Sequence, residues 1–417
     1  MERAAETHEP TSFALPVPGT SIRERSLRIR KETVRVFLPL ILAIVAISTY
    51  TYTRDSTFIS AENIQNVLSQ AAPLGILALG QTVLLIGAQL DLSVGSAASF
   101  CGAIAARLVI GPSTSEWVVV LVVVAVGGAI GLFWGVLVAY VRVPAFILTL
   151  GGLSVLSSAA LVLTNSTPIP IGSAFSVLAV GSWLGVQTPI VICAFLAIIV
   201  SLGLRYTRFG RNVFAVGSNE QAAYLSGVPT RSVKIMMFAL NGVLVAPAAL
   251  ILMAHLGSGD PTMGSGLELQ AVAAGVLGGA SLLGGRGSVV GTVLAVVLFG
   301  VIASSLVFLN ISGNYEDMVY GGVLIVAVTL AALGDRQTGE GIFGVLRRGW
   351  SSLIHRPSDW TLQTGGTQAG ASESSHPQVL SDASLSTGVD KDGKKDEPGE
   401  IVARSPLGGS NEQSGYE

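Results

Sequence analysis

One carboxylate stands out among the few polar residues in the apolar parts of this sequence. Asp91 lies in the stretch LDLSVGS (90–96), between two apolar runs that are each nearly long enough to cross a bilayer. Asp91 and Ser93 can cap a helix predicted to start at about Val94 and can complement its positive end. The carboxylate can instead contact a substrate or a gating partner, and the sequence leaves both roles open. We expect this joint near the inner membrane interface, because a carboxylate at the bilayer centre costs about 3 kcal/mol.

Several further polar side chains lie in or beside apolar runs, where they can line a path for a hydroxylated solute or bridge helices by hydrogen bonds. The predicted path residues are Gln81, Gln89, Asp91, Asn241, Glu268 and Gln270. No nucleophile, base and oxyanion donors converge in the sequence, so we predict no catalytic residue, no metal site and no cofactor. The two cysteines, Cys101 and Cys193, lie inside apolar runs and are expected to be core thiols.

The composition predicts a membrane protein. Of the 417 residues, 50% are apolar and only 12% are charged, against about 25% charged residues in a typical soluble domain. The mean hydropathy is +0.64, and a net charge of -2 gives no reason to expect nucleic-acid binding. We predict an all-α, polytopic fold with about ten transmembrane helices arranged as two related halves. The predicted spans lie near 36–53, 68–88, 94–110, 117–141, 144–164, 188–204, 232–256, 267–284, 289–309 and 316–334.

The positions of Lys and Arg orient these spans, because both residues are enriched on the cytoplasmic side. Six basic residues between Arg23 and Arg35 precede the first span, and a ten-span path also places the cluster at 205–211 inside. The sequence therefore divides into a cytoplasmic N-terminal segment (1–35), a transmembrane domain (36–335) and a polar cytoplasmic tail (336–417) that is predicted to be disordered. Both termini are expected in the cytoplasm. The outer segment 165–187 is predicted to be either a re-entrant or interfacial helix or a packed loop.

Two stretches of the chain resemble each other. Residues 77–99 and 271–295 both read as an apolar helix, a Gly-rich joint and a second helix that begins with Ser and Val. Internal repeats with broken helices are typical of transport proteins, whose sites lie between the repeats. In addition, Gly127, Gly131 and Gly135 lie four residues apart, a spacing that favours close helix packing in lipid.

The longest cytoplasmic connection, 205–234, contains signals for a short helix. Ser218 and Gln221 form a potential capping box, Gly227 suits the position after the helix, and Pro229 prevents its continuation. A helix of about eight residues is marginal by itself. It either docks on another molecule or packs on its own domain, and the physical argument does not choose between them. Nothing in the local sequence is expected to hold it.

Four stretches carry a resemblance to a known family. They are LDLSVGS, AVGSNEQAAYLSGV, GSGLELQAVAAGVLGGASLLGGRGSVVGT and VPAFILTLGGLSVLSSAALVLTNSTPI. The chain resembles, over about 36–335, the permease subunits of ABC importers of the ribose/xylose/galactose type. The resemblance implies a bacterial plasma-membrane permease without an ATPase site of its own. It also implies three protein partners: a cytoplasmic ABC ATPase, an extracytoplasmic sugar-binding protein and a second permease copy in a homodimer or heterodimer.

The resemblance favours docking for the loop helix, which corresponds to the family's coupling helix to the ATPase. The residues carried over are Ser218, Asn219, Glu220, Ala222, Ala223, Ser226 and Gly227. Ser218 stands where the family usually has Gly, and the stretch 310–317 is more polar than its family counterpart. The predicted function is ATP-driven import of a sugar or similar polyol. The alternatives are an ABC permease for an amino acid or nucleoside, or an ion-coupled secondary transporter.

Overall fold

The computed structural model describes residues 22–110 and 115–312, together with residues 315, 318–323, 325 and 329. For residues 22–36 only the backbone is described. All of these residues belong to the first of two units, Met1–His355; the second is Arg356–Glu417. Most of the predicted span at 316–334 and the whole tail after 335 therefore lie outside the described residues.

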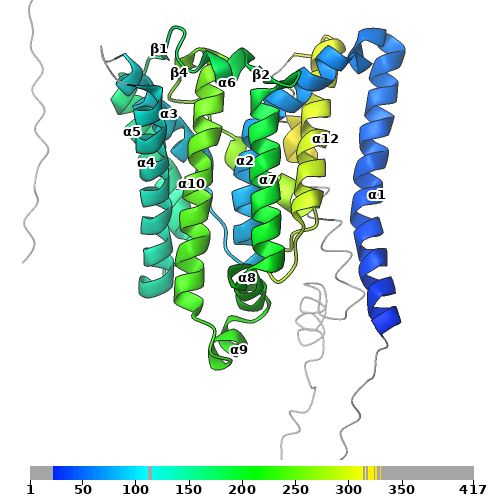
Figure 1. Ribbon diagram of the computed structural model, residues 1–417, viewed down its shortest axis with the longest axis vertical. Helices are drawn as coiled ribbons and strands as arrows, with labels where there is room; N and C mark the ends of the chain where they lie inside the picture. Colours follow the sequence, from blue (N-terminus) through cyan, green and yellow to red (C-terminus); the bar gives the residue numbers. More distant parts are fainter. Residues whose placement is uncertain are drawn as a thin grey trace, which may run out of the picture. The chain divides into compact units, whose positions relative to one another are not determined.

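Seven helices in the described part are long and apolar enough to cross a membrane. They are α1 (Ile22–Arg54, apolar from Phe37), α2 (Ala61–Ile86), α4 (Glu116–Val136, continued by the π-helix η2, Leu137–Val141), α5 (Ala145–Thr164), α7 (Thr188–Tyr206), α10 (Thr230–Leu256) and α12 (Val289–Phe308). Figure 1 shows these helices running side by side.

Two further apolar helices are shorter. α3 (Val94–Val109) and α11 (Leu267–Leu277) each adjoin a Gly-rich connection, and α11 is only about 16 Å long at 1.5 Å per residue. The predicted span 267–284 thus ends early, because the glycines after Leu277 form a loop. The helical fold class is confirmed, whereas the predicted number of about ten spans is not. The arrangement in two related halves remains a prediction.

The remaining elements lie at the two ends of the long helices (Figure 1). At one end are the short helix α6 (Ser176–Val180) and two antiparallel pairs: β1 (Ile169–Pro170) with β4 (Ser258–Gly259), and β2 (Ser182–Trp183) with β3 (Val186–Gln187). At the other end are α8 (Arg208–Ser218) and α9 (Glu220–Leu225). The 3-10 helix η1 (Ser56–Ile59) joins α1 to α2.

The segment 165–187 is mostly a loop and contains no re-entrant helix, while an interfacial position of its short helix remains a prediction. Its only helix, α6, has five residues. Ile169, Ile171 and Phe175 are buried, and the Phe175 N–H donates to Glu116 Oε1 at 2.9 Å. The first part of this segment therefore packs on the protein, whereas Val177 and Val180 of α6 are 57% and 82% exposed.

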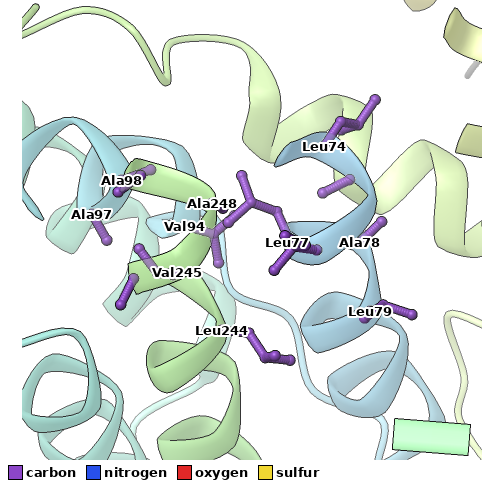
Figure 2. Close-up of a cluster of buried hydrophobic side chains, with 14 of the residues drawn as sticks. Leu74, Leu77, Ala78, Leu79, Val94, Ala97, Ala98, Leu244, Val245 and Ala248 are labelled. Atoms are coloured by element: carbon purple, nitrogen blue, oxygen red, sulfur yellow. The ribbon is translucent and has the colours of Figure 1, made fainter. Parts of the chain in front are cut away.

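The core lies around α2, α3 and α10. Leu74 and Leu77 of α2, Val94 of α3, and Val245 and Ala248 of α10 belong to one cluster of buried apolar side chains (Figure 2). The helices also pack through close backbone contact. This is expected in a membrane, where the hydrophobic effect does not favour association of helices with one another over contact with lipid.

Glycines let α4 and α10 approach closely. A Cβ at Gly127 would overlap the carbonyl of Gly242, and a Cβ at Gly131 would overlap that of Phe238. The packing role predicted for the glycines of α4 is confirmed.

Candidate functional site

The segment between α7 and α10 contains two helices instead of one. The sequence-based interpretation missed α8, which begins after Thr207, whose hydroxyl caps it by accepting from the Gly210 N–H at 3.1 Å. The signal was present: Val213 and Val216 are buried while Arg208 and Arg211 are exposed, a period of three to four residues.

The predicted capping box of α9 is wrong. Ser218 is the last residue of α8, and its hydroxyl donates to the Phe214 carbonyl at 2.8 Å. Asn219 is the N-cap of α9 instead, because its extended backbone lets Oδ1 accept from the Ala222 N–H at 2.9 Å. α9 has six residues rather than about eight. Gly227 follows the C-cap Ser226 and has φ +82°, a conformation unfavourable to residues with a Cβ, so its predicted position after the helix is confirmed.

Local contacts hold α9 on its own domain, contrary to the expectation that nothing does. Ala223 is buried, with 6% of its surface exposed. Glu220 pairs with Lys234 of α10 at 2.7 Å, which joins the two helices. The bond from the Ser226 hydroxyl to the Ala222 carbonyl at 2.8 Å lies within the end of α9 and stabilises only the helix itself.

The opposite side of α9 is free to contact another molecule. Tyr224 and Leu225 are 68% and 78% exposed. The two alternatives for this helix are therefore compatible, because one side packs on the protein and the other presents apolar side chains.

A cleft of about 830 Å³ lies beside α9. α9 and the start of α10 contribute Glu220, Tyr224 and Arg231 to its lining, and Arg142 after η2 and Gln89 after α2 lie on other sides. Gln89 is the only predicted path residue among those that line it.

Asp91 and two other predicted path residues form a buried hydrogen-bond network. Asp91 Oδ1 accepts from the Ser93 N–H at 2.8 Å and from its hydroxyl at 2.6 Å, while Oδ2 accepts from Asn241 Nδ2 at 2.8 Å. In the amide orientation that satisfies both of its groups, Gln81 bonds the Asp91 backbone N–H and carbonyl at 3.3 and 3.2 Å. The adjacent Leu92 N–H donates to Thr149 Oγ1 of α5 at 3.1 Å. The turn between α2 and α3 is thereby tied to α5 and α10.

The expected position of Asp91 near the inner interface is wrong. Its partner Asn241 lies close to the middle of α10, so the carboxylate lies at about half the depth of that helix. Hydrogen-bond donors satisfy both carboxylate oxygens, and Gln81 and Thr149 bond backbone groups of the turn. These bonds offset the cost of burying a carboxylate at this depth. Ser93 makes no cap bond through its side chain, because its hydroxyl donates to Asp91 instead.

The remaining two path candidates lie elsewhere. Glu268 and Gln270 are half-buried near the start of α11. Glu268 Oε1 accepts from the Gly266 N–H at 3.2 Å, and a Cβ at Gly95 of α3 would overlap its other oxygen. The six candidates therefore fall into three places: the network around Asp91, the start of α11 and the cleft beside α9.

The described residues contain no group of three or more His, Cys, Asp or Glu side chains that could hold a metal ion. A set of membrane-length helices, with interruptions at Gly-rich turns and a buried polar network, is typical of membrane transport proteins.

Comparison with known proteins gives the family. The family model described as the branched-chain amino acid transport system / permease component matches residues 63–328, and the chain belongs to this family. The ribose import permease of Escherichia coli is 37% identical over 293 residues, which cover 69% of this chain and 91% of that protein. The xylose transport system permease of Haemophilus influenzae is 31% identical over 363 residues, covering 72% and 97%. No solved structure matches the chain.

Proposed function

We propose that this protein is the membrane-spanning subunit of an ATP-driven importer that moves a sugar or similar polyol into the cytoplasm of a bacterium. The similarity to a ribose and a xylose permease over nearly their whole lengths carries this proposal. The family description names branched-chain amino acids, so an amino-acid permease is the second candidate. A panel of labelled substrates distinguishes the two.

The proposed mechanism requires three partners outside this chain: an ABC ATPase on the cytoplasmic side, a sugar-binding protein on the opposite side and a second permease copy. ATP binding to the ATPase pushes α9 and shifts the permease between outward- and inward-facing states. This population shift needs different ATPase contacts in the two states, and it needs no covalent chemistry in the permease.

The structure of α9 supports the proposal that this helix contacts the ATPase. It combines a buried anchoring face at Ala223 with the exposed side chains of Tyr224 and Leu225. Of the seven residues first assigned to docking, Asn219, Glu220 and Ser226 then shape the helix, whereas the exposed apolar pair makes the contact. Sequence reasoning did not select Tyr224 or Leu225, because exposure on a short helix depends on which side packs.

For the substrate path we propose separate roles for the candidate residues. Gln89 borders the cleft beside α9 and is suited to contact a hydroxylated solute near its exit. Gln81, Asp91 and Asn241 hold the turn between α2 and α3 through bonds to one another. Glu268 and Gln270 lie at the start of the second broken pair, α11 and α12.

Transport in proteoliposomes tests the function. The permease is reconstituted with its ATPase and binding protein, and uptake of labelled pentoses, hexoses, branched-chain amino acids and nucleosides is measured. We expect ATP-dependent uptake of a sugar. Uptake of an amino acid or nucleoside alone would support the second candidate, and uptake driven by an ion gradient without the ATPase would contradict ABC import.

The ATPase contact has its own test. Leu225→Glu places a charge on the exposed side of α9, and we expect the ATPase no longer to co-purify with the permease. Leu184→Glu is the matched control, because Leu184 is fully exposed in the turn between β2 and β3, and β2 lies at the opposite end of the long helices from α9 (Figure 1). Equal ATPase recovery with both variants would show that α9 is not the contact.

A further inference from the structure

Three separate segments meet as bare backbone next to α9. They are the end of α2 at Ile86, the end of α8 at Gly217 and the loop 278–288 between α11 and α12. The Gly285 N–H donates to the Ile86 carbonyl at 2.8 Å. A Cβ at Gly217 would overlap the same carbonyl oxygen. No side chain can therefore be accommodated at Gly217 without moving α2 or α8.

The loop contributes two glycines whose conformation and surroundings both exclude larger residues. Gly284 and Gly285 have φ of +87° and +75°, which is unfavourable for residues with a Cβ. A Cβ at Gly284 would lie 2.5 Å from the Gly217 carbonyl oxygen and 2.7 Å from Ala88, and a Cβ at Gly285 would lie 2.6 Å from Ser218 Oγ. The loop thus fits closely against both α8 and the first residues after α2.

We call Gly217, Gly284 and Gly285 around Ile86 the glycine junction. It connects α9 with the turn between α2 and α3 and with the loop between α11 and α12. Along the chain, Gly217 comes two positions before Asn219, the cap of α9. Ile86 leads directly into the turn that contains Asp91. The loop leads into Ser288, the cap of α12.

We propose that the glycines of this junction are positioning residues for transport, which transmit a displacement of α9 to the turn between α2 and α3 and to the loop between α11 and α12. Closely packed backbone has no flexible side chain that could absorb a shift of α8, so the shift moves its neighbours. The inference rests on the proposed docking of the ATPase at α9. It adds that the single contact between the ATPase and α9 moves both the turn between α2 and α3 and the loop between α11 and α12.

The test uses the complete importer in inside-out membrane vesicles. Leu283 is 78% exposed on the loop, so Leu283→Cys serves as a loop reporter, with Cys193→Ala removing the half-buried native thiol. Labelling of the loop reporter by a maleimide is measured with and without a non-hydrolysable ATP analogue. We expect the labelling rate to change on nucleotide binding.

Gly217→Ala is the variant that separates the segments of the junction. We expect it to keep ATPase co-purification, to abolish the nucleotide response of the loop reporter and to lower ATP-dependent uptake about tenfold, equivalent to about 1.4 kcal/mol. Gly203→Ala in α7 is the matched control, because its Cβ would have no neighbour within 4 Å. It should behave like the wild type in all three measurements.

The outcomes separate this inference from the proposed function. A wild-type reporter response and uptake in Gly217→Ala would overturn the junction, as would an unresponsive loop reporter in the otherwise unchanged importer. ATPase loss in Gly217→Ala equal to that in Leu225→Glu would show that Gly217 only shapes the docking surface, which also overturns it. ATPase binding by Leu225→Glu would instead refute the docking proposal. The nucleotide response of the loop reporter, with and without Gly217→Ala, would still support or contradict the role of the junction.

If Gly217→Ala does not reach the membrane, Gly285→Ala carries the test. Its Cβ would lie 2.6 Å from Ser218 Oγ and 3.1 Å from Ser218 Cα, a smaller overlap than that of a Gly217 Cβ with the Ile86 carbonyl oxygen, so Gly285→Ala perturbs the same junction less severely. The same loss of the reporter response with retained ATPase supports the junction, and an unchanged response contradicts it.

Discussion

The two helix breaks look alike in sequence, yet different groups hold them. The first break, between α2 and α3, has Asp91 at its centre, with both carboxylate oxygens bonded to side-chain or backbone donors. The second break, between α11 and α12, has no carboxylate. Its loop closes on itself through the Ser281 N–H, which donates to the Arg286 carbonyl at 3.1 Å, and through glycine contacts.

The serines that begin the second helix of each pair also differ. Ser288 caps α12 by accepting from the Gly291 N–H at 3.3 Å, whereas Ser93 donates to Asp91. The first break depends on charge and hydrogen bonding in a buried place, and the second depends on the absence of side chains. Similar sequence signals for a turn therefore do not imply the same sensitivity to substitution.

The largest effect is expected from removing the buried carboxylate. Asp91→Ala leaves the Ser93 N–H, the Ser93 hydroxyl and the Asn241 amide without their acceptor, at a cost of about 3 kcal/mol. The thermal midpoint of the detergent-solubilised protein should fall strongly.

Asp260 provides a matched control for Asp91→Ala. It accepts from the N–H and hydroxyl of Thr262 in the same arrangement, at 2.7 Å each, but in an exposed turn. Because water can replace the lost acceptor there, Asp260→Ala should cost about 1 kcal/mol or less. Equal losses for the two variants would mean that burial is not what distinguishes the first break.

A smaller loss is expected from filling the second break. Gly278 at the end of α11 packs against Gly291 and Thr292 of α12, and a Cβ there would overlap the Thr292 backbone nitrogen. Gly278→Ala should destabilise the protein by about 2 kcal/mol through overpacking, measured by the same thermal midpoint. Gly151→Ala in α5, where no atom lies within 4 Å, should not destabilise it. An unaffected Gly278→Ala protein would show that the two breaks do not differ in the proposed way.

The helix cap of the second break gives the next effect. Ser288→Ala removes the acceptor for the Gly291 N–H and should cost about 1 kcal/mol. Ser288→Asp, which keeps an acceptor at the cap, should restore most of the lost stability. Failure of Asp to restore it would indicate that Ser288 contributes through packing rather than capping.

The smallest effect is expected outside both breaks. Glu220 is 51% exposed where it pairs with Lys234 at 2.7 Å, and an exposed pair of this kind contributes about 0.5 kcal/mol. Glu220→Gln should leave the thermal midpoint nearly unchanged, and high salt should remove the remaining difference from the wild type. A loss as large as that of Gly278→Ala would place α9 among the elements that hold the breaks.

The sequence by itself determined the class of the molecule and indicated that two of its stretches are interrupted by Gly-rich joints. Long apolar runs specified the membrane-length helices, since their length and composition are local properties. The Gly-rich joint within 77–99 marked the first break and Gly227 marked the position after α9, whereas the second break begins after Leu277, earlier than the span predicted for 267–284. Four motif stretches were sufficient to indicate the permease family that the comparison then gave.

Only the tertiary structure decided how these elements are used. The sequence distinguishes Asp91 as a carboxylate between apolar runs, but its depth depends on Asn241, which lies 150 positions later in the chain. Ser218 and Asn219 are both favourable N-cap residues. Asn219 caps α9 because α8 extends through Ser218. The contact of Gly217 with Ile86 and Gly285 joins three distant segments. Each of these outcomes is set by long-range packing, which a local pattern of residues does not contain.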